Sequence, residues 1–143
     1  MPAESGVSNG IQLWINLPKR LKQVDAEYQQ VNVDEFPVEE IEGGTVKMIV
    51  GKNSPLKLKT NVFYQHVILN KDAFYKINIQ SGMRGIVYVM EGSISVNSVN
   101  AAQAAFIETE ESLEFKATQN NEFMLCMGVP HGEPIRQHGP FVD

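Results

Sequence analysis

Three histidines could hold a metal ion in this chain of 143 residues. His66 stands alone in an apolar stretch, whereas His131 and His138 lie near the end of the chain with Pro134 between them. Imidazoles that bind one ion together are commonly two residues apart on a strand or four apart on a helix. No pair of these histidines has that spacing, so we expect surface or capping roles and no metal site.

The single cysteine, Cys126, is the one thiol that could act as a nucleophile. It lies in the apolar run Phe123–Met127, which predicts a buried and inert side chain. A catalytic thiol needs a cationic neighbour and some exposure, and this run offers neither. Two tyrosines, Tyr64 and Tyr88, are candidates to line the mouth of a barrel that admits a small apolar ligand; the alternative for both is core packing.

Composition and charge argue against a nucleic-acid-binding protein and against a membrane protein. Hydrophobic residues make up 43% of the chain, charged residues 20%, and the net charge is −5. Nucleic-acid binding requires clustered Lys and Arg, and the basic residues here are scattered, so we expect neither nucleic acid nor membrane as a partner. No secretory or membrane-spanning apolar run is present. We therefore expect a cytoplasmic protein, with a nuclear location open if the source is eukaryotic.

Short apolar runs separated by turn residues recur along the chain at intervals of about 8–12 residues, a pattern typical of β-sandwiches and barrels. No amphipathic helix of ten residues is predicted. Outside residues 11–17 and 86–96, which are described next, the expected strands are Thr45–Val50, Asn61–Leu69, Phe74–Ile79, Ala104–Ile107, Leu113–Ala117 and Glu122–Gly128.

The central stretch predicts a hairpin. Ile86–Val89 is apolar at every position, which favours a strand covered on both faces. Glu91 and Gly92 then form a tight turn, and Ser93–Val96 alternates as a half-buried strand does. We expect this hairpin at the centre of a jelly roll.

The N-terminal region divides into an arm and a strand. Residues 1–10 are small and polar and predict a linker, while residues 11–143 are expected to form a single domain. Ile11–Leu17 alternates cleanly and predicts a strand that ends at Pro18. Trp14 falls on the face opposite the aliphatic residues, so we expect it to contact a second domain or subunit. It is our interface candidate.

Motifs near both ends of the chain resemble the pirin family. Gly10–Pro18 (Gly-Ile-Gln-Leu-Trp-Ile-Asn-Leu-Pro) resembles the segment that opens the second cupin domain of pirins. His131–Ile135 and Gln137–Val142 resemble the end of that domain. The resemblance implies an all-β fold, a cupin-type double-stranded β-helix or jelly-roll barrel. It covers nearly all of this chain but matches the C-terminal half of the family.

The family also implies where iron would be bound. Pirins hold iron in their first domain through a His-x-His pair, a Glu and a further His, and the second domain usually lacks the metal. Laid over this chain, the pair falls on Asn78 and Gln80, the Glu near Arg84, and the last His near Phe115. Amides are poor ligands for such ions, and Arg cannot ligate them. We therefore expect no cofactor in this chain, and iron only in a first domain that it lacks.

Three functions follow from the resemblance and the residues together. The leading hypothesis is a non-catalytic, pirin-like cupin domain that acts as a structural or protein-interaction module. It would form a homodimer or bind a pirin-type first cupin domain or other proteins. The enzymatic alternative is an iron-dependent oxygenase of the quercetin 2,3-dioxygenase type that works with a separate metal-bearing first domain. The third hypothesis is a small-molecule binder that uses the barrel cavity.

Overall fold

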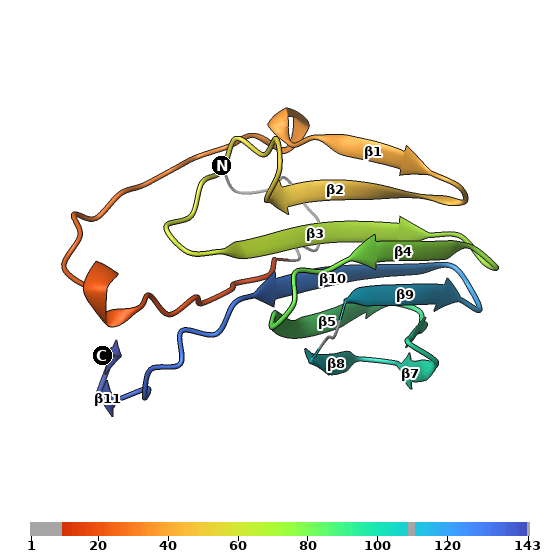
Figure 1. Ribbon diagram of the computed structural model, residues 1–143. Helices are drawn as coiled ribbons and strands as arrows, with labels where there is room; N and C mark the ends of the chain where they lie inside the picture. Colours follow the sequence, from red (N-terminus) through yellow and green to blue (C-terminus); the bar gives the residue numbers. More distant parts are fainter. Residues whose placement is uncertain (1–9, 109–110, 143) are drawn as a thin grey trace. The chain divides into compact units, whose positions relative to one another are not determined.

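A computed structural model describes residues 10–108 and 111–142, which fall into two compact units (Figure 1). The sandwich unit comprises Asp25–Gly132. The terminal unit combines the two ends of the chain, and its described part consists of residues 10–24 and 133–142. Among the described residues, no helix is long and apolar enough to cross a membrane. The predicted arm lies outside the described residues except for Gly10.

The first layer of the sandwich unit is an antiparallel sheet of six strands. Apolar and β-branched residues dominate its central strands, and such side chains pack well on a pleated surface. In spatial order the strands are β1 (Val38–Ile41), β2 (Gly44–Val50), β3 (Val62–Leu69), β10 (Asn121–Gly128), β5 (Arg84–Glu91) and β8 (Ala104–Glu108). Strands distant in sequence are thus paired at the centre of the sheet, as in a jelly roll.

The second layer is an antiparallel sheet of four shorter strands (Figure 1). Its order is β4 (Phe74–Asn78), β9 (Ser112–Ala117), β6 (Ile94–Val96) and β7 (Val99–Ala101). The all-β prediction is confirmed, and a strand lies within or across each of the six apolar runs named above.

The core lies between these two sheets and is closed by aromatic rings. Phe115 of β9 stacks on Phe123 of β10 with ring centroids 4.9 Å apart, and Tyr75 of β4 stacks on Phe115 at 5.8 Å. Both phenylalanines are fully buried. The hydroxyl of Tyr75 donates a hydrogen bond to Oε1 of the buried Gln65 at 3.3 Å. Large side chains from both layers therefore fill the interior of the sandwich.

The central stretch differs from the predicted hairpin. β5 pairs with β10 and β8, whereas β6 pairs with β7 and β9, so the chain crosses from one sheet to the other at Gly92. Gly92 has a φ of 76°, and a Cβ there would lie 2.4 Å from the carbonyl oxygen of Asn120, so this crossing requires glycine. Tyr88 is 49% exposed, so β5 is covered on one face and not on both.

The terminal unit contains little regular structure. It has a 3-10 helix, η1 (Lys19–Leu21), and a two-stranded hairpin, β11 (Gln137–His138) with β12 (Phe141–Val142). The strand predicted over Ile11–Leu17 is wrong, because this segment joins no sheet among the described residues. Trp14 is 81% exposed in this unit.

Candidate binding surface on the outer sheet face

The outer face of the six-stranded sheet is set by alternation along its strands. Val67, Val87 and Leu125 point into the core and are fully buried. Because successive side chains on a strand point to opposite faces, their neighbours His66, Tyr88 and Met124 point outward. In an apolar run, the sequence alone does not show which side chains lie on this outer face and which lie in the core.

Two cross-strand rows of side chains cover this outer face. Tyr64, Cys126, Ile86 and Phe106 oppose one another in register across β3, β10, β5 and β8. The next row contains Met124, Tyr88 and Ala104. We call these seven residues the outer patch. Phe106, at its edge, is 89% exposed. Side chains directly opposite each other across strands are in contact range, so the patch is continuous.

An imidazole and a carboxylate lie at one end of the outer patch. His66 of β3 opposes Met124, and its Nε2 lies 2.6 Å from Oε1 of Glu122, the diagonal neighbour on β10. Both side chains are partly buried. This pair lies beside the apolar rows. From the sequence we expected a surface or capping role for His66 but did not identify Glu122 as its partner, because the two residues are 56 positions apart in the chain.

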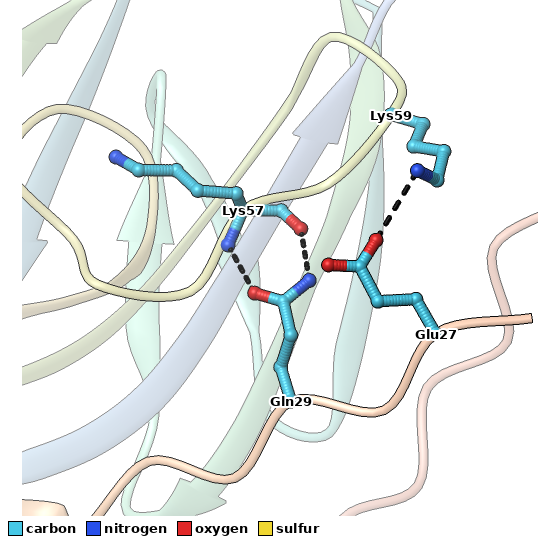
Figure 2. A network of polar contacts seen from close by, with 4 residues as sticks. All are labelled: Glu27, Gln29, Lys57 and Lys59. Atoms are coloured by element: carbon cyan, nitrogen blue, oxygen red, sulfur yellow. Dashed lines mark hydrogen bonds and ion pairs between the residues drawn. The ribbon is translucent and has the colours of Figure 1, made fainter.

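A segment before β1 is fastened to the loop that precedes β3. We call residues 25–36 the strap; it ends in a 3-10 helix, η2 (Val33–Glu35). Figure 2 shows its anchor: the amide of Gln29 donates to the carbonyl oxygen of Lys57 at 2.7 Å and accepts from the Lys57 N–H at 3.0 Å. Glu27 and Lys59 form an ion pair of 3.2 Å beside it. The side-chain amide of Gln29 thus satisfies both backbone groups of Lys57, as the backbone of a neighbouring strand would.

The strap and the sheet together enclose a shallow hollow of about 290 Å³. Its walls are mostly aliphatic and thioether side chains, with His66 and Lys47 as the polar members; they are Val31, Val33, Phe36, Lys47, Ile49, His66, Met90 and Met124. A mostly apolar hollow with few polar groups suits an apolar side chain or ligand that offers one hydrogen-bonding group.

Burial favours the neutral forms of two ionisable groups of the outer patch, Cys126 and Tyr64. Burial raises the pKa of the Cys126 thiol. Burial also raises the pKa of Tyr64, and the neighbouring Cys126 adds to that increase. A protonated thiol is a weak nucleophile, so the chemistry of this surface is that of contact and hydrogen bonding.

Three of the four positions that the family resemblance assigned to iron, those of Asn78, Gln80 and Arg84, lie on the surface of the sandwich unit, whereas Phe115 is fully buried in its core. Asn78 and Gln80 are exposed, and the residues between and before them, Ile77 and Ile79, point toward the core. Gln80 accepts a hydrogen bond from Asn61 at 2.9 Å. Arg84 is exposed and pairs with Glu108 at 3.3 Å. The three exposed side chains do not converge on an inward point: Asn78 ends β4, Gln80 follows it, and Arg84 begins β5.

The chemistry of the described residues does not fit an iron site. Within residues 10–108 and 111–142, no group of three or more His, Cys, Asp or Glu side chains is close enough to hold a metal ion. The inward side chains of β4 and β9 are aromatic and aliphatic. Such side chains offer no ligand atoms to a transition metal.

The two tyrosines predicted at a barrel mouth are brought to one surface. Tyr64 and Tyr88 both lie in the outer patch, on either side of β10, and neither points into the core. A ligand that contacts them would bind to the outer sheet face. From the sequence we did not identify Phe106 as a surface candidate. Because side chains alternate along a strand, the strand predicted over Ala104–Ile107 already implied that Phe106 and Ile107 face opposite sides.

Comparison with known families places the chain among cupins. The Pirin C-terminal cupin domain family matches residues 64–143. The chain is 31% identical to pirin of Rattus norvegicus over 156 aligned positions, which cover 99% of this chain and 53% of that protein. It is 27% identical to a Thermoplasma acidophilum protein that is provisionally named a quercetin 2,3-dioxygenase, covering 93% of this chain and 57% of that one.

Solved structures show the same fold. A quercetin 2,3-dioxygenase from Acinetobacter baumannii superimposes with a TM-score of 0.80 at 24% identity, over 90% of this chain and 48% of that one. The chain spans about half the length of each of these relatives.

Proposed function

Because the chain belongs to the pirin family and corresponds to its C-terminal cupin domain, we propose that it is a non-catalytic module that binds a protein partner. The outer patch is the surface we assign to that binding. The proposal rests on one observation: Phe106, Tyr88 and Ala104 are exposed, and their half-buried neighbours continue the two rows of the outer patch.

An exposed apolar surface of this kind favours protein contact. Contiguous apolar patches on soluble proteins commonly mark interfaces. Aromatic residues and methionine are enriched at interface cores, whereas Lys and Glu are depleted. Tyr64, Tyr88, Phe106 and Met124 match that composition, and the carboxylate of Glu122 lies at the rim beside His66.

The partner we propose is a pirin-type first cupin domain. The chain spans 53% of rat pirin, so that relative carries a second stretch of similar length that this chain does not match. A second copy of this chain is the competing occupant of the outer patch.

Nuclear magnetic resonance tests this assignment. The ¹⁵N-labelled chain would be titrated with the unmatched half of rat pirin as the probe domain. We expect signals of the outer patch to shift or broaden, while those of β4 and β9 on the other sheet stay in place. Unchanged outer-patch signals at high micromolar concentrations of both chains would contradict the proposal.

An oxygenase that works with a separate metal-bearing domain is the second candidate. The name of the Thermoplasma relative favours it. Iron content and oxygen consumption with quercetin would be measured for the chain, for the probe domain, and for their mixture. We expect no stoichiometric iron and no turnover in the chain alone, and no increase in the mixture above the probe domain. Turnover that rises on mixing would favour the oxygenase.

A further inference from the structure

A second hollow lies entirely within the terminal unit. It has a volume of about 530 Å³ and is lined by side chains from both ends of the chain. The lining residues are Lys19, Lys22, Gln23, Glu133, Pro134, Arg136 and His138. It is distinct in composition from the apolar hollow beneath the strap, since charged side chains form most of its wall.

The charge of this wall is opposite to that of the chain. Lys19, Lys22 and Arg136 contribute three positive charges and Glu133 one negative charge, so the wall carries a net charge of +2. The whole chain has a net charge of −5. A concave wall with a net positive charge raises the local concentration of anions.

The one carboxylate of the wall is already engaged. The backbone N–H of Lys19 donates to Oε2 of Glu133 at 2.7 Å. The ammonium group of Lys22 donates to Oδ1 of Asn16 and to the carbonyl oxygen of Val142, which ties the end of the chain to the segment before η1. These bonds hold the two segments together and place the cations around one hollow.

We propose that this hollow binds a small anion that carries phosphate or carboxylate groups. The guanidinium of Arg136 offers the planar pair of donors that recognises both groups, and Lys19 adds a point charge. The imidazole of His138 supplies a further hydrogen-bond donor. A hollow of about 530 Å³ holds an organic anion larger than a free phosphate ion and lies in the range of about 300–1,000 Å³ common for ligand pockets.

The site would serve a purpose separate from the outer patch. It uses neither sheet of the sandwich unit, and each of its lining residues lies in the terminal unit. Binding of a bridging anion would couple the first and last described segments of the chain, because each contributes at least one cation. The ligand would therefore stabilise the terminal unit by mass action.

The test is a titration of the full chain with two probes, inorganic phosphate and succinate, at constant ionic strength. Chemical-shift changes are followed in the ¹⁵N-labelled protein. We expect saturable changes at residues 16–23 and 133–138. Tighter binding of phosphate than of succinate assigns the site to phosphorylated ligands, and the reverse order assigns it to carboxylates. The absence of saturable changes with both probes would overturn the proposal.

Matched variants distinguish specific anion binding in the hollow from nonspecific electrostatic attraction of the anion to the protein. Arg136→Glu and Arg20→Glu change the net charge equally, but Arg20 lies outside the lining of the hollow. We expect Arg136→Glu to weaken binding by about tenfold or more, as loss of a charge-assisted hydrogen bond implies, and Arg20→Glu to have little effect. Arg136→Gln is the second variant, in case the acidic replacement disturbs the β11–β12 hairpin. Equal losses in the Arg20 and Arg136 variants would refute the site.

Discussion

At the scale of single residues, Cys126 illustrates how the position of a residue in a sheet affects the pKa of its side chain. It lies between Tyr64 and Ile86 in the outer patch and is partly buried, so burial raises the pKa of its thiol. A buried, inert thiol was predicted from the apolar run around it. The side chain is half-buried on the outer face, and its inertness stays a prediction that the raised pKa supports. Its outward direction was not predicted, because a continuous apolar run carries no information on which face is inside.

The raised pKa of Cys126 predicts a dependence of stability on pH. Above pH 9.0, the ordinary pKa of a thiol, the unfolded chain loses a proton that the folded chain keeps. The free energy of unfolding should therefore fall as pH rises beyond this value, and should be insensitive to this group at lower pH. Urea denaturation at a series of pH values measures the slope. Cys126→Ala should reduce it, and equal slopes for both proteins would contradict the prediction.

The alternation of side chains along a strand also explains where the two tyrosines lie. The sequence identified Tyr64 and Tyr88 as ligand-contact candidates, and the structure places both in one patch. Which face of the sheet they occupy depends on which neighbours the second layer covers. Gln65, a polar residue, is buried inside while the aromatic Tyr88 is half exposed, and hydrophobicity alone would have reversed that assignment.

At the scale of elements, most strands could be predicted from periodicity and turn residues, but their partners could not. The run Ile86–Val89 was correctly placed in a strand, yet its return strand joins the other sheet at Gly92. Pairing depends on contacts between residues far apart in sequence, which local pattern does not encode. Ile11–Leu17 shows the converse, since a clean alternation does not by itself make a strand, and this segment joins no sheet among the described residues.

The contact between the two layers gives a prediction on stability. Phe115 of β9 is buried and stacks on Phe123 of β10 and on Tyr75. Phe115→Ala should lower the free energy of unfolding by about 3–5 kcal/mol, because it leaves a cavity between the sheets. Phe106→Ala is the matched control: at 89% exposure, its effect should be within about 0.5 kcal/mol. Urea denaturation compares them, and similar losses would contradict this description of the core.

At the scale of the whole molecule, exposed aromatic residues occur in both units. Phe106 and Tyr88 lie in the sandwich unit, and Trp14 lies in the terminal unit. Large exposed aromatic side chains on two units favour more than one contact in an assembly. The homodimer expected from Trp14 stays a prediction, independent of the partner that we propose for the outer patch.

Fluorescence tests the contribution of Trp14 directly, since it is the single tryptophan of the chain. At 81% exposure its emission should be that of a solvated indole in dilute solution. If Trp14 enters an interface between copies, the emission should shift to shorter wavelength as the protein concentration rises. Trp14→Ser should then weaken self-association measured by sedimentation. An emission that stays constant while the chain associates would exclude Trp14 from the interface.

The central claim, that the outer patch is a protein-binding surface, is tested most directly by sedimentation of two matched variants. Phe106→Glu places a charge in the patch, whereas Phe74→Glu places the same charge on β4 of the other sheet, where Phe74 is 53% exposed. Both side chains are exposed, so both variants should fold. We predict that the wild-type chain and Phe74→Glu bind the probe domain or a second copy at high micromolar concentration, and that Phe106→Glu does not. Equal binding by the two variants, or a wild-type chain that remains monomeric with and without the probe domain, would contradict the account.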